Sequence, residues 1–204
     1  MIGAGFAVLL LVLPIGCTGF FVNQPTSVTV TPNAPSLTAG QTQTFTAQAA
    51  FSDNTTKNVT PNATWSTSNP CIVAIIATGN GAGNATTVGS GGSVTVTASY
   101  NGVSGTATPT APTGLTISPC QPQKAVTSAA GIFPQVVFQT GQSGIVFSAA
   151  ASGTDVSATW TSNNTSVVTF QNPASGAATF VGAGSATITA TSNTDTGSLA
   201  LVVQ

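Results

Sequence analysis

The sequence predicts an all-β fold made of two similar modules in tandem, after an apolar N-terminal segment. The first observation is an internal repeat, because residues 65–75 align without a gap with residues 160–170, and each stretch begins with a tryptophan. The second is the alternation of apolar and polar residues in short runs separated by Gly, Pro and Asn turns, which is typical of β-strands. The third is that no segment carries the apolar spacing of a globular helix. A repeat of this length indicates two copies of one structural unit.

The first module follows a short tether and opens with a strand whose Val28 and Val30 point to one face. Trp65 begins an inner strand. Residues 79–92 are rich in glycine and predict a loose excursion. Apolar alternation predicts the other strands over residues 27–31, 45–51, 72–76, 93–98 and 103–107.

The second module repeats this plan, with Trp160 at the start of its inner strand. It differs by a longer insert, residues 120–140, which is rich in Gln, Ala and Pro and leaves the first strands of the module undefined. The expected strands contain residues 115–117, 145–151, 167–170, 178–180, 186–190 and 199–203.

These patterns predict a domain over residues 25–108, a linker over residues 109–112 and a second domain over residues 113–204. The prolines around the linker stiffen the chain without making it helical. About seven short strands in each ~90 residues, with frequent turns, are typical of an Ig-like β-sandwich.

Three motifs resemble the bacterial Ig-like domain of group 2, a family met in intimin- and invasin-like adhesins and in surface lipoproteins. They are a Gly-Gln turn, a T-W-x-S-x-N strand and a G-x-G-x-A-T-I-T-A segment. The resemblance implies two Ig-like sandwiches in a non-enzymatic surface protein. The matching residues are Gly40, Gln41, Thr64, Trp65, Ser68 and Asn69 in the first module, and Gly141, Gln142, Thr159, Trp160, Asn163 and residues 182–190 in the second.

The chain is poor in reactive and charged side chains, with two lysines, three acidic residues and no histidine. General acid–base catalysis uses a side chain that exchanges protons near neutral pH, and nucleic-acid binding needs a basic patch. A zinc site needs more Cys and His ligands than this sequence supplies. The aspartates Asp53, Asp155 and Asp195 are far apart in sequence and predict solvated turn residues rather than a calcium site. We therefore expect no catalytic site, no metal, no cofactor and no nucleic-acid partner.

The N-terminus predicts export. Residues 2–15 form an uncharged apolar run, and Leu13-Pro-Ile-Gly-Cys17 resembles the lipobox of bacterial lipoproteins. The resemblance implies a signal peptide over residues 1–17, a lipid on Cys17 and a tether over residues 18–24. An uncleaved anchor or pilin-like segment, and ordinary cleaved secretion, remain as alternatives because no Lys or Arg precedes the apolar run. All three place the modules outside the cytoplasm, and a lipid places them at the outer membrane or cell surface.

Two pairs of residues are structural candidates. Trp65 and Trp160 are expected in the cores, since each begins an inner strand and recurs in the other copy. Cys71 and Cys120 are the candidate disulfide, which an exported compartment permits. That bridge would clamp the two modules together, while two unpaired thiols are the alternative.

The leading functional hypothesis is a cell-surface structural or adhesive protein, attached to the membrane by its N-terminal lipid or apolar segment. The alternative is a subunit of an extracellular filament, whose apolar N-terminus drives polymerisation and whose charge-poor surface favours self-association. Any other partner would be a surface polymer or protein.

Overall fold

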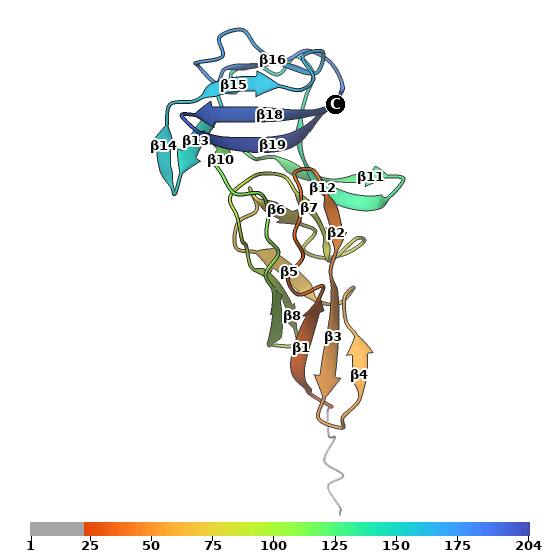
Figure 1. The fold of residues 1–204 in the computed structure, drawn as a ribbon. Helices are drawn as coiled ribbons and strands as arrows, with labels where there is room; N and C mark the ends of the chain where they lie inside the picture. The colour runs from red at the N-terminus through yellow and green to blue at the C-terminus, as the bar shows by residue number, and fades with distance from the viewer. Residues whose placement is uncertain (1–22) are drawn as a thin grey trace, which may run out of the picture.

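The computed structural model describes residues 23–204, in which all regular structure is β-strand and two domains are stacked one on the other (Figure 1). The all-β, Ig-like sandwich fold predicted from the sequence is confirmed. The predicted signal segment 1–17 with Cys17, and most of the tether, lie outside the described residues.

Domain 1 is built from three small antiparallel sheets that enclose one core. The sheets have the orders β1-β3-β4, β2-β7-β6 and β5-β8-β9. The strands are β1 (Pro25–Thr31), β2 (Thr42–Thr44), β3 (Thr46–Phe51), β4 (Thr56–Asn58), β5 (Thr64–Thr67), β6 (Val73–Ile75), β7 (Asn84–Thr87), β8 (Val96–Tyr100) and β9 (Val103–Ala107).

The core of domain 1 is centred on Trp65, which is 1% exposed and donates its indole N–H to the Thr60 carbonyl at 3.1 Å. Val28 and Val30 are buried as their alternation in β1 predicts. Gly83 packs so closely that an added Cβ would lie 2.6 Å from a backbone oxygen and 3.1 Å from the Trp65 ring. A side chain at this position would therefore displace the core tryptophan.

The loose excursion predicted over residues 79–92 is wrong, because this segment contains β7, the middle strand of its sheet. The glycines lie on both sides of the strand: Gly79, Gly81 and Gly83 come before it with positive φ, and three more follow it at positions 89, 91 and 92. The strand itself is short and made of small residues, and its Thr86 and Thr87 are buried. No apolar alternation marks such a strand in the sequence.

Domain 2 contains a five-stranded sheet of order β11-β12-β19-β18-β15, a three-stranded sheet β10-β13-β14 and the pair β16-β17. Its strands are β10 (Thr116–Ser118), β11 (Gln123–Ser128), β12 (Gly131–Phe138), β13 (Ser148–Ala151), β14 (Thr154–Val156), β15 (Thr159–Ser162), β16 (Val168–Phe170), β17 (Ala178–Phe180), β18 (Gly184–Ser192) and β19 (Asp195–Val203).

The insert 120–140 is a β-hairpin. Strand β11 pairs antiparallel with residues 131–136 of β12, and the end of β12 pairs parallel with β19. The hairpin projects beside domain 1 in Figure 1. The first strands of domain 2, which the sequence left undefined, are thus partly supplied by the insert.

Aromatic side chains fill the core of domain 2. Phe138 stacks on Phe180 with ring centroids 4.6 Å apart, and Phe147 lies 6.0 Å from Trp160, which is 3% exposed. Such pairs add to the apolar burial that holds a sandwich together. Two residues of domain 1, Ala74 and Val88, belong to the same buried cluster, so the core of domain 2 extends across the junction.

Candidate functional site: the junction between the domains

The residues that connect the domains are paired with domain 1. The amide of Leu37 donates to the Thr110 carbonyl at 2.8 Å, and the amide of Thr110 donates to the Pro35 carbonyl at 2.9 Å. Ala111 is buried in the first core. The predicted linker, residues 109–112, therefore continues the last strand of domain 1 and pairs with the segment around Pro35 and Leu37. We describe residues 25–112 as domain 1 and residues 113–204 as domain 2.

A segment of domain 1 lies on the edge of a sheet of domain 2. The amide of Ala200 donates to the Val88 carbonyl at 2.7 Å, and the amide of Ser90 donates to the Ser198 carbonyl at 3.2 Å. The Ser198 amide also donates to the Ser90 hydroxyl at 2.8 Å. This segment and β12 follow one another along the same edge of β19. Domain 1 thus supplies a short strand to the sheet of domain 2.

The hairpin of domain 2 braces domain 1 from the side. The Asn84 side-chain amide donates to the Ile132 carbonyl at 2.7 Å, which ties β7 to β12. The Gln123 side-chain amide donates to the Pro70 carbonyl at 2.7 Å, which ties β11 to the turn before β6. Each contact joins residues of different domains, so the insert holds the orientation of the two modules.

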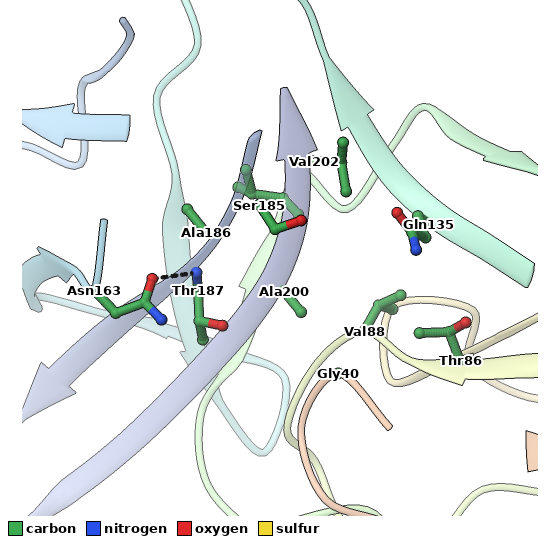
Figure 2. Close-up of a pocket in the computed structure, with 11 residues that line it drawn as sticks. Gly40, Thr86, Val88, Gln135, Asn163, Ser185, Ala186, Thr187, Ala200 and Val202 are labelled. Atoms are coloured by element: carbon green, nitrogen blue, oxygen red, sulfur yellow. Dashed lines mark hydrogen bonds between the residues drawn. The ribbon is translucent and has the colours of Figure 1, made fainter. Parts of the chain in front are cut away.

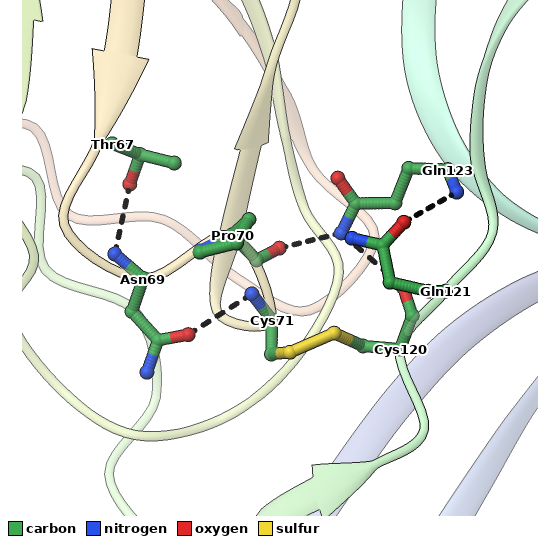
Figure 3. The surroundings of a disulfide bond; sticks show 7 residues. All are labelled: Thr67, Asn69, Pro70, Cys71, Cys120, Gln121 and Gln123. Atoms are coloured by element: carbon green, nitrogen blue, oxygen red, sulfur yellow. Dashed lines mark hydrogen bonds between the residues drawn. A yellow bond between two sulfur atoms is a disulfide. The ribbon is translucent and has the colours of Figure 1, made fainter.

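A disulfide joins Cys71 of domain 1 to Cys120 of domain 2, with the Cα atoms 5.3 Å apart (Figure 3). The Cys71 amide donates to the Asn69 side chain at 3.0 Å, which orients the cysteine at the end of its turn. Gln123 lies beside Cys120 and contacts its carbonyl. The sequence named these two cysteines; the turn and the hairpin bring them together.

A small cavity of about 220 Å³ opens where β7 meets the outer face of the five-stranded sheet (Figure 2). Asn163, Ser185 and Thr187 lie on one side of it, and Thr86 and Gln135 lie on the other. The Thr86 hydroxyl and the Gln135 side-chain oxygen are buried with no hydrogen-bond partner in the protein. The residues that line this cavity carry no charge.

The other residues singled out in the sequence are dispersed. Both tryptophans are buried in separate cores, as described above. The aspartates lie in different elements, and the described residues contain no group of three acidic, Cys or His side chains placed to hold a metal. In residues 23–204 we also find no helix with the length and apolarity needed to cross a membrane.

Asp53 is the charged residue with a clear local partner. Its carboxylate accepts hydrogen bonds from the Thr55 hydroxyl at 2.6 Å and from the Thr55 amide at 2.9 Å. These bonds favour the charged form and hold the pKa of Asp53 below its ordinary value. The carboxylate is fully exposed in a turn at the far end of domain 1, so it stabilises a loop and does not form a reactive site.

Comparison with known proteins decides the family of domain 1. Residues 25–111 match the family model of the bacterial Ig-like domain (group 2). Domain 1 is a bacterial Ig-like domain of group 2. The match ends at Ala111, so for domain 2 membership of this family stays a prediction from its motifs, while its strand arrangement is Ig-like.

One curated relative of the chain is Ice-binding protein 1 of Shewanella frigidimarina, which is 36% identical over 179 residues. The match covers 83% of the chain and 18% of the relative, so the chain spans less than a fifth of that protein. Among solved structures, domains 5–6 of the S-layer protein SbsC match with 18% identity and a TM-score of 0.34, over 89% of this chain and 98% of that one. The titin Ig tandem A164–A165 matches with 12% identity and a TM-score of 0.25, over 87% and 96% of the chains.

Proposed function

We propose that the two domains form a rigid, non-enzymatic spacer in an exported cell-surface protein. The observation that carries the proposal is the junction, where a shared sheet edge, a hairpin brace and a disulfide join the domains. Domains of one chain that are joined only by a flexible linker move relative to each other. Here the connecting residues are paired and the core of domain 2 includes Ala74 and Val88 of domain 1, which favours a fixed relative orientation.

Composition supports the same role. The described residues present Ser, Thr and Asn side chains on their surface and few charges, and no cluster of titratable side chains lines a cavity. The cell-surface setting follows from the family to which domain 1 belongs and from the export signal predicted in the sequence. The relative that binds ice, by its name, is much longer than this chain. We propose that this chain corresponds to a structural part of such a protein, and we assign no ice contact to it.

Residual dipolar couplings of the full chain test the rigidity. If the junction is rigid, one alignment tensor fits the amides of both domains. A variant with both Cys71→Ser and Cys120→Ser changes tests how much of the rigidity depends on the disulfide. Tensors of clearly different magnitude for the two domains in the oxidised chain would contradict the spacer proposal.

We propose further that a lipid on Cys17 attaches the spacer to a membrane. The intact mass of the native mature protein tests this, because a diacylglycerol-modified N-terminal Cys17 adds a defined mass. An unmodified chain that keeps the residues before Cys17 and is recovered in fibres would favour the filament alternative instead. Adhesion to a surface polymer or protein would be an additional property of the same surface.

A further inference from the structure

Domain 1 holds domain 2 through one face of a sheet, which we call the docking face. Ala74 on β6 and Thr86 and Val88 on or after β7 point out of the core of domain 1 and are buried by domain 2. Val88 is 1% exposed and belongs to the core cluster of domain 2. The docking face is therefore defined by the outward side of β6 and β7.

Domain 2 contains the same backbone arrangement at its own β16 and β17. In domain 1, the Val88 amide donates to the Ile72 carbonyl at 2.9 Å. In domain 2, the Val181 amide donates to the Val167 carbonyl at 2.8 Å. Val181 thus occupies in domain 2 the position that Val88 occupies in domain 1.

A second pair of bonds fixes the register of the neighbouring strand. The amide of Phe45 donates to the Gly83 carbonyl, and the amide of Phe147 donates to the Gly176 carbonyl, both at 2.9 Å. Counting from these glycines, Thr179 of β17 corresponds to Thr86 of β7. The outward residues of β17 are therefore the equivalents of the docking face.

The equivalent of Val88 is uncovered, because Val181 is 50% exposed. Beside it, Val146, which corresponds to Thr44 of domain 1 and bridges to Ala177, is 58% exposed. They are the large apolar side chains that the described part of the chain leaves exposed. Ala177 and Thr179 are exposed between them. We call Val146, Ala177, Thr179 and Val181 the open face; none of its side chains is charged.

We propose that the open face is the docking site for another Ig-like domain, seated on domain 2 as domain 2 is seated on domain 1. The inference rests on the spacer role proposed above and extends it. The occupant is identified by this chain itself, because the equivalent face of domain 1 is covered by an Ig-like domain. Removal of uncharged, partly apolar surface from water favours such contacts. Ser166 stands at the position of Cys71, so this second junction forms without a disulfide.

A second copy of the whole chain cannot occupy the open face in the same way. The surface that domain 2 offers to domain 1 includes Ile132, Gln135 and Ala200, and domain 1 of the same chain already covers it. The occupant must be an Ig-like domain whose corresponding sheet edge is free. The open face is thus specific for a further module of this kind.

The register of the chain allows a direct test. Ala98 pairs with Gly105 in domain 1, and Ala190 pairs with Gly197 in domain 2, so Gly197 corresponds to Gly105. Counting on from these glycines, Gln204 corresponds to Pro112, and a second copy of residues 113–204 placed after Gln204 of the full chain continues in register. In this extended chain Ser166→Cys places a thiol where Cys71 lies in the first junction.

We expect non-reducing peptide mapping to show a disulfide between position 166 and Cys120 of the added copy. Ser157→Cys, at another exposed position of domain 2, is the matched control and should form no such bridge. Addition of Val181→Asp should lower the yield of the bridge by at least about tenfold, since a charge opposes burial of the face.

Every other result overturns the inference. Equal yields of the disulfide to Cys120 of the added copy from positions 157 and 166 would show random oxidation of tethered thiols. A folded added copy with its own alignment tensor would show that the open face does not hold it. An added copy that stays unfolded would also count against the inference, because domain 1 supplies core residues to its neighbour and the open face would fail to do so. None of these results bears on the rigidity of the junction between domains 1 and 2, which is tested separately in the unextended chain.

Discussion

Val88 and Val181 hold equivalent backbone positions in the two domains, yet one is 1% exposed and the other is 50% exposed. The hydrogen bonds of their amides match to within 0.1 Å, so the local fold does not cause the difference. The difference in exposure comes from the neighbouring domain, because domain 2 covers Val88 and the described residues place nothing over Val181. The repeat therefore specifies the sandwich, while the residues that differ between the copies specify the junction.

Those differences concentrate where the domains meet. Cys71 corresponds to Ser166, and Ser90, whose hydroxyl binds domain 2, corresponds to Ala183. The hairpin of residues 120–140 exists only in domain 2, where it braces domain 1. Each change adds a contact across the junction that one sandwich alone would not need.

The two valines provide the sharpest test of this comparison. Val88→Asp buries a carboxylate without a partner and should lower the free energy of unfolding by about 5 kcal/mol. Val181→Asp places the same charge on an exposed face and should change it by no more than about 0.5 kcal/mol. Urea denaturation of both variants, followed by tryptophan fluorescence, measures the difference. Equal losses for the two variants would refute the assignment of the docking face.

Loss of the disulfide should have the next largest effect. The bond closes a loop with a sequence separation of 49 residues, which in the chain-entropy model stabilises the folded state by about 4 kcal/mol. The variant with Cys71→Ser and Cys120→Ser should lose about that amount in denaturant titrations. Addition of reductant to the unmodified chain should give the same loss, and a loss that reductant does not reproduce would mean that the serines act by other means.

Ser90→Ala gives domain 1 the residue that domain 2 has at this position. The change leaves the partly buried amide of Ser198 without its hydroxyl acceptor and should cost about 1 kcal/mol. Ser93→Ala, in the same segment but with its hydroxyl facing Thr110 within domain 1, is the control and should have a small effect. If both variants were equally stable, the bond between Ser90 and Ser198 would not contribute to the junction.

The sequence predicts the parts of this fold that depend on local alternation. The strand with Val28 and Val30 and the two inner strands that begin near the tryptophans follow from period-two patterns and from the repeat. The strand β7 could not be found in this way, because Asn84-Ala-Thr-Thr87 has no apolar alternation and is buried by its neighbours. A short strand made of polar residues is predicted as a loop when the strands and the domain that bury it are unknown.

The junction was harder to predict than the sandwiches, since its contacts join residues far apart in the chain. The sequence named Cys71 and Cys120 because these are the cysteines that follow the apolar segment. Nothing in the sequence indicated that Val88 pairs with Ala200. The insert 120–140 was recognised as a difference between the copies, but its pairing as a hairpin depends on the edge of β19.

The ends of the domains away from the junction also differ. We expect this difference to have the smallest effect on stability of those considered. The β3–β4 turn of domain 1 contains Asp53, whereas the equivalent β13–β14 turn of domain 2 is Ser152-Gly153. Because hydrogen bonds from Thr55 lower the pKa of Asp53 in the folded state, its contribution to stability is present above its ordinary value of 3.8. That contribution is lost as the pH falls through the lower, folded-state pKa. We therefore expect Asp53→Asn, which removes the titrating carboxyl group, to make unfolding slightly less sensitive to acid. Thr55→Val should have the same effect, because loss of the hydroxyl raises the folded-state pKa of Asp53 toward its ordinary value. Denaturant titrations at acidic and neutral pH measure this, and an acid sensitivity that neither variant changes would place its origin outside this turn.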